Sequence, residues 1–253
     1  MILAGLQKLT LLDYPGLVAC TIFTAGCDLR CPYCHNASIV LPDRDGPHLS
    51  EDALFAFLQK RRGLLDGVAV TGGEPLVHGG IDALLTGIKT IDLKGMRLLH
   101  RDLPALLRRI KELGYKIKLD TNGTFPDRLR SVVFDGLADR VAMDIKNSPE
   151  KYPAATGTPA ISLNPIRESA AFLLEGKVEY EFRTTAVRGL HEPEDFRSIG
   201  KWIAGAREYY IQNFCDSGDI IDGHGIGAFS KDELASLADA ARPFVPSVKI
   251  RGL

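Results

Sequence analysis

The sequence has almost no net charge and no long apolar run. Its 31 basic and 32 acidic residues leave a formal charge of -1 over 253 residues, so no global field attracts nucleic acid or an anionic membrane. Its apolar runs stay well below the ~18 residues that a membrane-spanning helix needs. We therefore expect neither nucleic acid nor a membrane among the partners.

The first 30 residues also lack an export signal. They begin MILAGLQKLTLLDYPG, without a basic segment, an apolar segment and a small-residue cleavage site in that order. We expect a cytoplasmic location, where thiols stay reduced. Three of the five cysteines fall within eight residues, from Cys27 to Cys34. In a reducing compartment this spacing indicates a metal or redox site instead of disulfides.

The stretch CDLRCPYCHN, residues 27–36, is compatible with three kinds of site. CPYC resembles a glutaredoxin dithiol, and CPYCH matches the attachment pattern for c-type haem. With Cys27 included, the pattern is C-x3-C-x2-C, which places three thiolates on one loop. Haem is normally attached outside the cytoplasm, and a thioredoxin-like domain is far shorter than this chain. Cys27 is superfluous for both, whereas a metal cluster requires it, so the pattern favours a cluster.

Apolar segments rich in β-branched residues alternate along the chain with capped helical segments. The predicted strands are Leu17–Thr24, Gly67–Thr71, Tyr115–Asp120, Arg140–Asp144, Val178–Val187 and Tyr209–Asn213. The predicted helices run from Ser50 to about Arg62, Asp102 to Gly114, Pro126 to Phe134, Asn164 to Leu174, Pro193 to Ala204 and Ser230 to Ala241. Six such βα units predict a parallel α/β sheet that curls into a barrel or a large part of one. We expect a single domain over 1–253, with a core at about 17–214 and a C-terminal helix and tail at 215–253.

Charged residues alternate with apolar ones along three of the predicted strands. The side chains on one face of these strands include Lys118 and Asp120 on the first, Asp144 and the following Lys146 on the second, and Arg183 on the third. Strands at a sheet edge can show such a face to water. The alternative is a lumen that holds a polar cofactor, because closed barrels normally fill theirs with branched apolar side chains. Asp120, Asp144 and Glu74 also fall at strand carboxyl ends, where such folds place their sites.

The chain resembles radical S-adenosylmethionine enzymes. Within them it is similar to the activating proteins of anaerobic ribonucleoside-triphosphate reductase, which are related to pyruvate formate-lyase activating enzyme. The motifs that carry this resemblance are LLDYPG (Leu11–Gly16), TAGCDLRCPYCHN (Thr24–Asn36), TGGEP (Thr71–Pro75), KLDTNG (Lys118–Gly123), VAMDIK (Val141–Lys146) and YEFRTTAVRGLH (Tyr180–His191). The sequence departs from the family in the segment 77–101 and in the glycine-rich loop 216–229, whose roles stay open.

The cluster motif is explained by iron–sulfur chemistry. A cubane cluster takes four ligands, so Cys27, Cys31 and Cys34 can hold three irons of a 4Fe-4S cluster and leave the fourth exposed. The resemblance implies that S-adenosylmethionine chelates this fourth iron and is cleaved by one electron to a 5'-deoxyadenosyl radical. Cys20 and Cys215 are interpreted as a small buried residue or idle thiol, and two spare cysteines cannot build a second four-thiolate cluster.

The resemblance also implies a set of residues that bind S-adenosylmethionine. Tyr33 would contact the adenine, Gly72 and Gly73 would let backbone approach the cofactor, and Glu74 would accept a hydrogen bond from the methionine amino group. The remaining candidates are Asp120, Thr121, Asn122, Arg183 and Thr185. Asp144 and Lys146 form either a structural pair or a functional one. No further catalytic side chain is predicted.

These inferences combine into a partial (β/α)6 barrel of the radical S-adenosylmethionine type. The predicted function is oxidoreductase chemistry that generates a glycyl radical on a partner enzyme, first of all anaerobic ribonucleotide reductase, with a flavodoxin or ferredoxin as electron donor. One alternative is a radical enzyme that acts on a small molecule or on another glycyl-radical enzyme. The second alternative is a non-catalytic iron–sulfur or zinc-binding module. A structural zinc site would need a fourth ligand besides the three cysteines, such as His35. Asp219, Asp222 and His224 are interpreted as part of a flexible surface loop, since Gly and Asp favour turns.

Overall fold

The computed structural model describes residues 1–42, 48–79 and 102–252. Its sheet has eight strands in the order of the sequence: β1 (Leu3–Thr10), β2 (Ala19–Thr24), β3 (Gly67–Gly72), β4 (Lys116–Thr121), β5 (Arg140–Asp144), β6 (Glu179–Ala186), β7 (Tyr209–Asn213) and β8 (Val248–Arg251). β1 pairs antiparallel with β2, and every later neighbour is parallel. β1 and β8 each pair with one neighbour in the described sheet, so the barrel is partial and open between them.

The six predicted strands are confirmed as β2 to β7. The two outer strands were not predicted. The middle of β1 is exposed on its edge and contains Gly5, and β8 is only four residues long, so neither carries a strong strand pattern. β8 belongs to the tail after residue 214 and adds the last parallel strand to the sheet.

The described residues form the six predicted helices and two shorter ones. They are α1 (Ala37–Val40), α2 (Glu51–Lys60), α4 (Leu103–Glu112), α5 (Pro126–Phe134), α6 (Tyr152–Thr156), α7 (Asn164–Leu174), α8 (Pro193–Trp202) and α9 (Lys231–Ala241), with a 3-10 turn, η1, at Pro75–His78. Asp102 accepts from the Ala105 N–H at the start of α4, which stabilises that helix by about 1 kcal/mol. The short α1, α6 and η1 were not predicted. Most of the predicted segment 77–101 lies outside the described residues.

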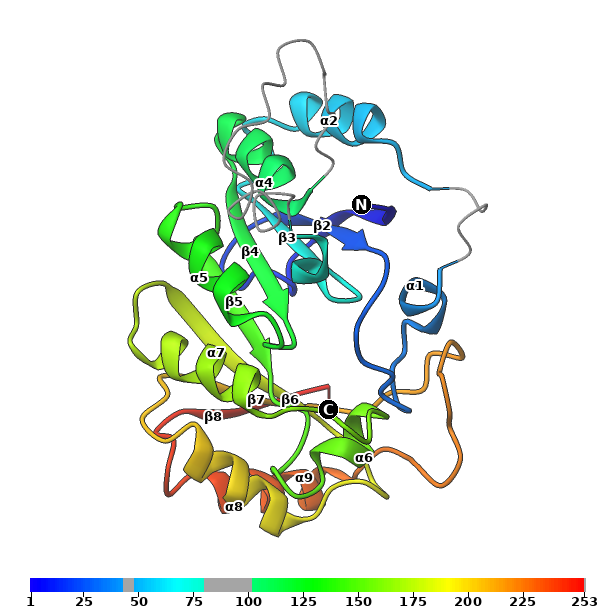
Figure 1. Cartoon of the computed structure of the whole chain (residues 1–253), viewed down its shortest axis with the longest axis vertical. Coiled ribbons are helices and arrows are strands. Elements are labelled where there is room, and N and C mark those ends of the chain that lie inside the picture. Colours follow the sequence, from blue (N-terminus) through cyan, green and yellow to red (C-terminus); the bar gives the residue numbers. More distant parts are fainter. Residues whose placement is uncertain (43–47, 80–101, 253) are drawn as a thin grey trace.

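The helices α4, α5 and α7 lie on the opposite side of the sheet from the cysteine loop (Figure 1). Figure 1 shows α4, α5 and α7 along one side, while the chain between β2 and α1 runs over the other. The main core lies between the sheet and the helices and contains Ile117, Val141 and Phe182. Within the described residues, no helix is both long and apolar enough to cross a membrane.

The inner face of the sheet is polar, as the strand alternation predicts. Lys118 is 1% exposed and Glu181 is fully buried, so these side chains do not face water. The explanation by exposed edge strands is therefore wrong for β4 and β6. Burying charges in this way is tolerated only where they are paired, and the inner face contains the partners: Arg140 binds Glu181, and Lys118 binds Asp120.

Candidate active site

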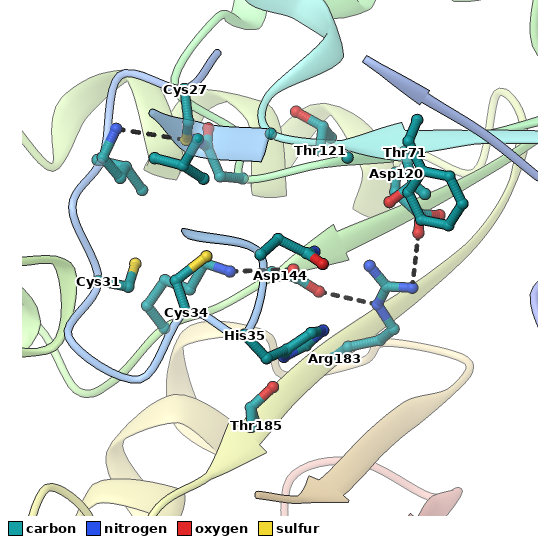
Figure 2. Close-up of a pocket in the computed structure, with 18 of the residues that line it drawn as sticks. Cys27, Cys31, Cys34, His35, Thr71, Asp120, Thr121, Asp144, Arg183 and Thr185 are labelled. Carbon is teal, nitrogen blue, oxygen red and sulfur yellow. Dashed lines mark hydrogen bonds and ion pairs between the residues drawn. The ribbon is translucent and has the colours of Figure 1, made fainter. Parts of the chain in front are cut away.

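A cavity of about 300 Å3 lies at the carboxyl ends of the parallel strands. Its lining includes all but one of the predicted site residues: Cys27, Cys31, Tyr33, Cys34, Gly72, Gly73, Asp120, Thr121, Asn122, Arg183 and Thr185. Figure 2 shows the three labelled cysteines on one side of this cavity and Arg183 with its ion pairs on the other. Cys20 is buried in the main core and Cys215 is exposed, so neither shares this lining.

The cysteine loop has a small hydrophobic core of its own. Leu29, Cys31 and Tyr33 are buried together with Ala155, Val187 and Phe214, and the half-buried Cys27 and Cys34 pack against them. The Arg30 N–H also donates to the Thr156 carbonyl at the end of α6. A Cβ on Gly157, which follows that helix at φ 59°, would lie 2.1 Å from the Arg30 carbonyl oxygen. The end of α6 thus requires glycine to approach the loop.

Two thiols of this loop have raised pKa values, which favours their protonated form in the absence of metal. Burial raises the pKa of Cys27 to about 12 and that of Cys31 to about 11. Thiolates are the metal-binding form, so metal uptake must release these protons. Among the described residues, no three His, Cys, Asp or Glu side chains surround a single ion. The three cysteines line one cavity, and a cubane cluster takes a separate ligand on each iron.

Gly72, the last residue of β3, and Gly73 bring that strand against the start of the cysteine loop. The Gly73 N–H donates to the Thr24 carbonyl, and the Glu74 N–H donates to the Gly26 carbonyl. A Cβ on Gly73 would lie 1.9 Å from the Gly26 carbonyl oxygen, and one on Gly72 would lie 2.3 Å from that of Thr24. The neighbouring backbone therefore leaves no room for a side chain at either position. Both glycines also line the cavity, and their predicted approach to the cofactor stays a prediction.

Glu74 is the predicted site residue that does not line the cavity. It is fully buried, and one carboxylate oxygen accepts from the Leu76 N–H and the Thr121 hydroxyl while the other accepts from the Asn122 N–H. Burial raises the pKa of Glu74 to about 8, against these hydrogen bonds, which lower it. The carboxylate therefore ties η1 to the end of β4 from beneath the cavity floor.

A chain of alternating charges crosses the inner face of the sheet. Arg183 donates to Asp120 at 3.0 Å and to Asp144 at 2.8 Å, Lys118 donates to Asp120, and Lys146 donates to Asp144 at 3.0 Å. Burial alone would raise the pKa of both aspartates, but Arg183 and the adjacent lysines lower it below the ordinary value. Both carboxylates are therefore ionised at neutral pH. The predicted Asp144–Lys146 pair is confirmed, and both residues line the cavity.

Tyr33 carries an unpaired polar group at the cavity. Its side chain is 4% exposed, and its hydroxyl has no hydrogen-bond partner among the described residues. A buried hydroxyl without a partner costs about 1–3 kcal/mol, which a polar ligand in the cavity can offset. Asn122 is used differently: its amide donates to Asp28 and its carbonyl accepts from Thr124.

Several polar residues of the lining were missed by the sequence analysis, among them Gln7, Asp13 and Gln212. Gln7 lies on β1, Asp13 follows it, and Gln212 lies near the end of β7. Asp13 accepts from the Thr21 hydroxyl at 2.5 Å, which holds its carboxylate over β2. Gln212 follows the same strand-end rule as Asp120 and was open to prediction. Gln7 and Asp13 were not, because the antiparallel β1 brings them to the inner face.

A family model described as "Radical SAM superfamily" matches residues 21–203, well over half of the chain. This region holds the cysteine loop and β2 to β6.

Individual proteins are similar over different shares of the chain. A Methanocaldococcus jannaschii protein named "Putative glycyl-radical enzyme activating enzyme MJ1227" is 28% identical over 99% of this chain and 95% of its own length. A 7-carboxy-7-deazaguanine synthase of Methanopyrus kandleri is 26% identical over 66% of each chain. Among solved structures, a domain of pyruvate-formate lyase-activating enzyme from Bacteroides vulgatus aligns with a TM-score of 0.53 at 13% identity, covering 74% of this chain and 99% of that domain. This last likeness shows the fold.

Proposed function

The chain belongs to the radical SAM superfamily, and on that premise we propose that it generates a glycyl radical on a partner enzyme. Members of this superfamily use a 4Fe-4S cluster and S-adenosylmethionine, which together supply a 5'-deoxyadenosyl radical that abstracts a hydrogen atom. The single observation that carries the proposal is the similarity to the M. jannaschii protein over almost the whole length of both chains.

The residues of the cavity divide between the two cofactors in this proposal. Cys27, Cys31 and Cys34 hold the cluster on one wall. Asp120, Asp144, Lys146 and Arg183 form a chain of ion pairs across the cavity, and such groups suit the amino and carboxylate ends of S-adenosylmethionine. Tyr33 stands between the second and third cysteines in the sequence, and its buried hydroxyl has no partner among the described residues, so the polar edge of an adenine can pair with it.

Glu74→Ala separates cofactor binding from cluster binding. The variant should keep its iron but bind S-adenosylmethionine at least about tenfold more weakly, because Thr121 and Asn122, which line the cavity, lose the acceptor that positions them, a change worth ~1–3 kcal/mol. Titration of the reconstituted protein with S-adenosylmethionine measures this. Three buried donors also lose their acceptor, so the unfolding free energy should fall. Lower stability at unchanged affinity would make Glu74 purely structural.

The open side of the sheet supports a macromolecular substrate. β1 and β8 leave the barrel unclosed, and the cavity lining reaches Gln7 on β1 and Gln212 on β7. A peptide loop of a partner can enter there, and glycine suits this approach because it lacks a side chain. We propose anaerobic ribonucleoside-triphosphate reductase as this partner, because the motifs LLDYPG, KLDTNG and VAMDIK resemble those of its activating proteins. A flavodoxin or ferredoxin is the proposed reductant.

A deuterium-transfer experiment tests the proposed partner. The reduced protein and S-adenosylmethionine are mixed with the reductase carrying Cα-deuterated glycine. We expect a glycine-centred radical in the electron paramagnetic resonance spectrum and deuterium in 5'-deoxyadenosine. Reductase with alanine in place of the target glycine is the control. Cleavage of the cofactor without deuterium transfer or a protein radical would exclude this partner.

A second candidate function is radical chemistry on a small molecule. It is favoured by the similarity to 7-carboxy-7-deazaguanine synthase over two thirds of the chain. In the same experiment, hydrogen transfer from a small metabolite to 5'-deoxyadenosine, in the absence of any partner protein, would replace the activase proposal with this one.

A further inference from the structure

The glycine-rich loop after β7 lies against the cysteine loop. Figure 1 shows the orange segment that follows β7 beside the blue segment leading into α1. The Asp222 N–H donates to the Pro32 carbonyl at 2.9 Å, and the Ser217 hydroxyl donates to that of His35 at 3.3 Å. These two contacts bracket Tyr33 and Cys34. We call residues 217–226 the clasp.

Asp219 makes the most contacts of the clasp with the cysteine loop. Its carboxylate accepts from the Ser38 hydroxyl at 2.7 Å and from the Ser38 N–H at 3.2 and 3.3 Å, while its own carbonyl accepts from the Ala37 N–H at 3.2 Å. One residue thus accepts from two successive N–H groups and one hydroxyl. All three donors lie three or four residues after Cys34.

Apolar contacts and fixed ends support the same arrangement. Ile220 and Ile226 pack against the small core that contains Cys31 and Tyr33. At one end of the clasp, Arg188 and Gly227 exchange backbone hydrogen bonds of 2.8 and 3.1 Å. A Cβ on Gly189 would lie 2.2 Å from the Gly225 carbonyl oxygen, so this end also requires close backbone approach. The loop that follows β6 therefore anchors the clasp. The clasp contacts the cysteine loop from the side opposite β3.

We propose that the clasp preorganises the cysteine loop for iron, with Asp219 as the positioning residue that acts through Ser38 and Ala37. The proposal rests on the assignment of Cys27, Cys31 and Cys34 as cluster ligands. Preformed ligand geometry lowers the ordering cost of binding, and groups around the ligands commonly hold them in place. It gives the segment 217–226 a role that its sequence alone did not reveal.

Alkylation of the apoprotein tests the clasp without iron, S-adenosylmethionine or a partner. Under anaerobic conditions, N-ethylmaleimide labelling of each cysteine is followed by mass spectrometry. Asp219→Ala should speed labelling of Cys34 about tenfold, the change expected from loss of a charge-assisted hydrogen bond. The exposed Cys215 and the buried Cys20 should keep their rates. Asp222→Ala is the matched control, because the Asp222 side chain contacts only His224 in the described structure.

Three results decide the proposal. Faster labelling of Cys34 with unchanged Cys20, reversed in Asp219→Asn, which keeps one acceptor oxygen, supports it. Unchanged labelling of Cys34 in Asp219→Ala overturns it. If Cys20 also becomes reactive, the whole fold has loosened, and Ser38→Ala decides instead: it removes only the hydroxyl of the same contact, and unchanged labelling of Cys34 there also overturns the proposal.

Iron release adds a second measurement on the loaded protein. Transfer of iron from the reconstituted protein to a chelator should be about tenfold faster in Asp219→Ala than in the wild type or Asp222→Ala. Equal rates would contradict the clasp. A wild type that binds no iron would instead contradict the proposed function, while the alkylation result would still report on the clasp.

Discussion

Alanine at Cys27, Cys31 or Cys34 is expected to abolish cluster binding, whereas alanine at Cys20 or Cys215 should leave it intact. The three ligands share the cavity wall, and a cubane with one open iron has no spare thiolate to replace a lost one. Cys20 packs in the main core with its pKa raised to about 12 by burial, and Cys215 lies on the surface. Neither lines the cavity.

Iron and sulfide analysis after anaerobic reconstitution measures this effect. We expect about four irons per chain in the wild type, Cys20→Ala and Cys215→Ala, and almost none in the three ligand variants. Cys20→Ala is also a stability control, because it leaves a small cavity in the core and should cost about 1 kcal/mol. A cluster that survives Cys34→Ala, or one lost with Cys215→Ala, would overturn the ligand assignment. Zinc in place of iron would favour the non-catalytic module.

Strands with strong local patterns were predictable, and the outer strands were not. β2 to β7 are apolar on the helix-facing parity, and all of them except β6 end in glycine or a polar residue, so they could be identified as strands from the local sequence. In β1, apolar and polar residues do not alternate regularly, because Gln7, Lys8 and Leu9 are exposed at the sheet edge and none of them has to be apolar. β8 is recognisable only from its pairing with β7, which is a long-range property.

The cavity shows the same division between local and long-range information. Residues at the strand ends could be assigned because parallel strands place their carboxyl ends at one edge. The contacts of Glu74 with Thr121 and Asn122 span 47 and 48 residues, and those of Asp219 with Ser38 span 181. The alternation of apolar and polar residues along the sequence gives no information about such long-range contacts. Sequence reasoning therefore identified Glu74 but placed it in the cavity, and it interpreted the clasp as a flexible loop.

Arg183→Met is expected to lower the unfolding free energy by about 3 kcal/mol at pH 7, because it leaves two partly buried carboxylates without their shared guanidinium. Arg183 is 12% exposed and binds both Asp120 and Asp144. The loss should lie at the low end of the usual range of ~3–5 kcal/mol for breaking a buried pair, since Lys118 and Lys146 each remain beside one aspartate. Denaturant unfolding of the apoprotein measures it.

The pH dependence of this loss distinguishes charge from packing. In the wild type, Arg183 and the lysines hold the pKa of both aspartates below the ordinary value of about 3.9, so their stabilisation is present above that pH and is lost as the pH falls. In the variant, burial acts with less opposition and raises both pKa values, so stability declines as the pH rises and the carboxylates ionise. The difference between the two proteins should therefore be largest near pH 7 and shrink toward pH 4. Arg188→Met, which removes a surface pair with Glu233, should cost under about 1 kcal/mol at either pH. A deficit in Arg183→Met that does not change with pH would mean that the side chain contributes by packing and not by neutralising the two aspartates.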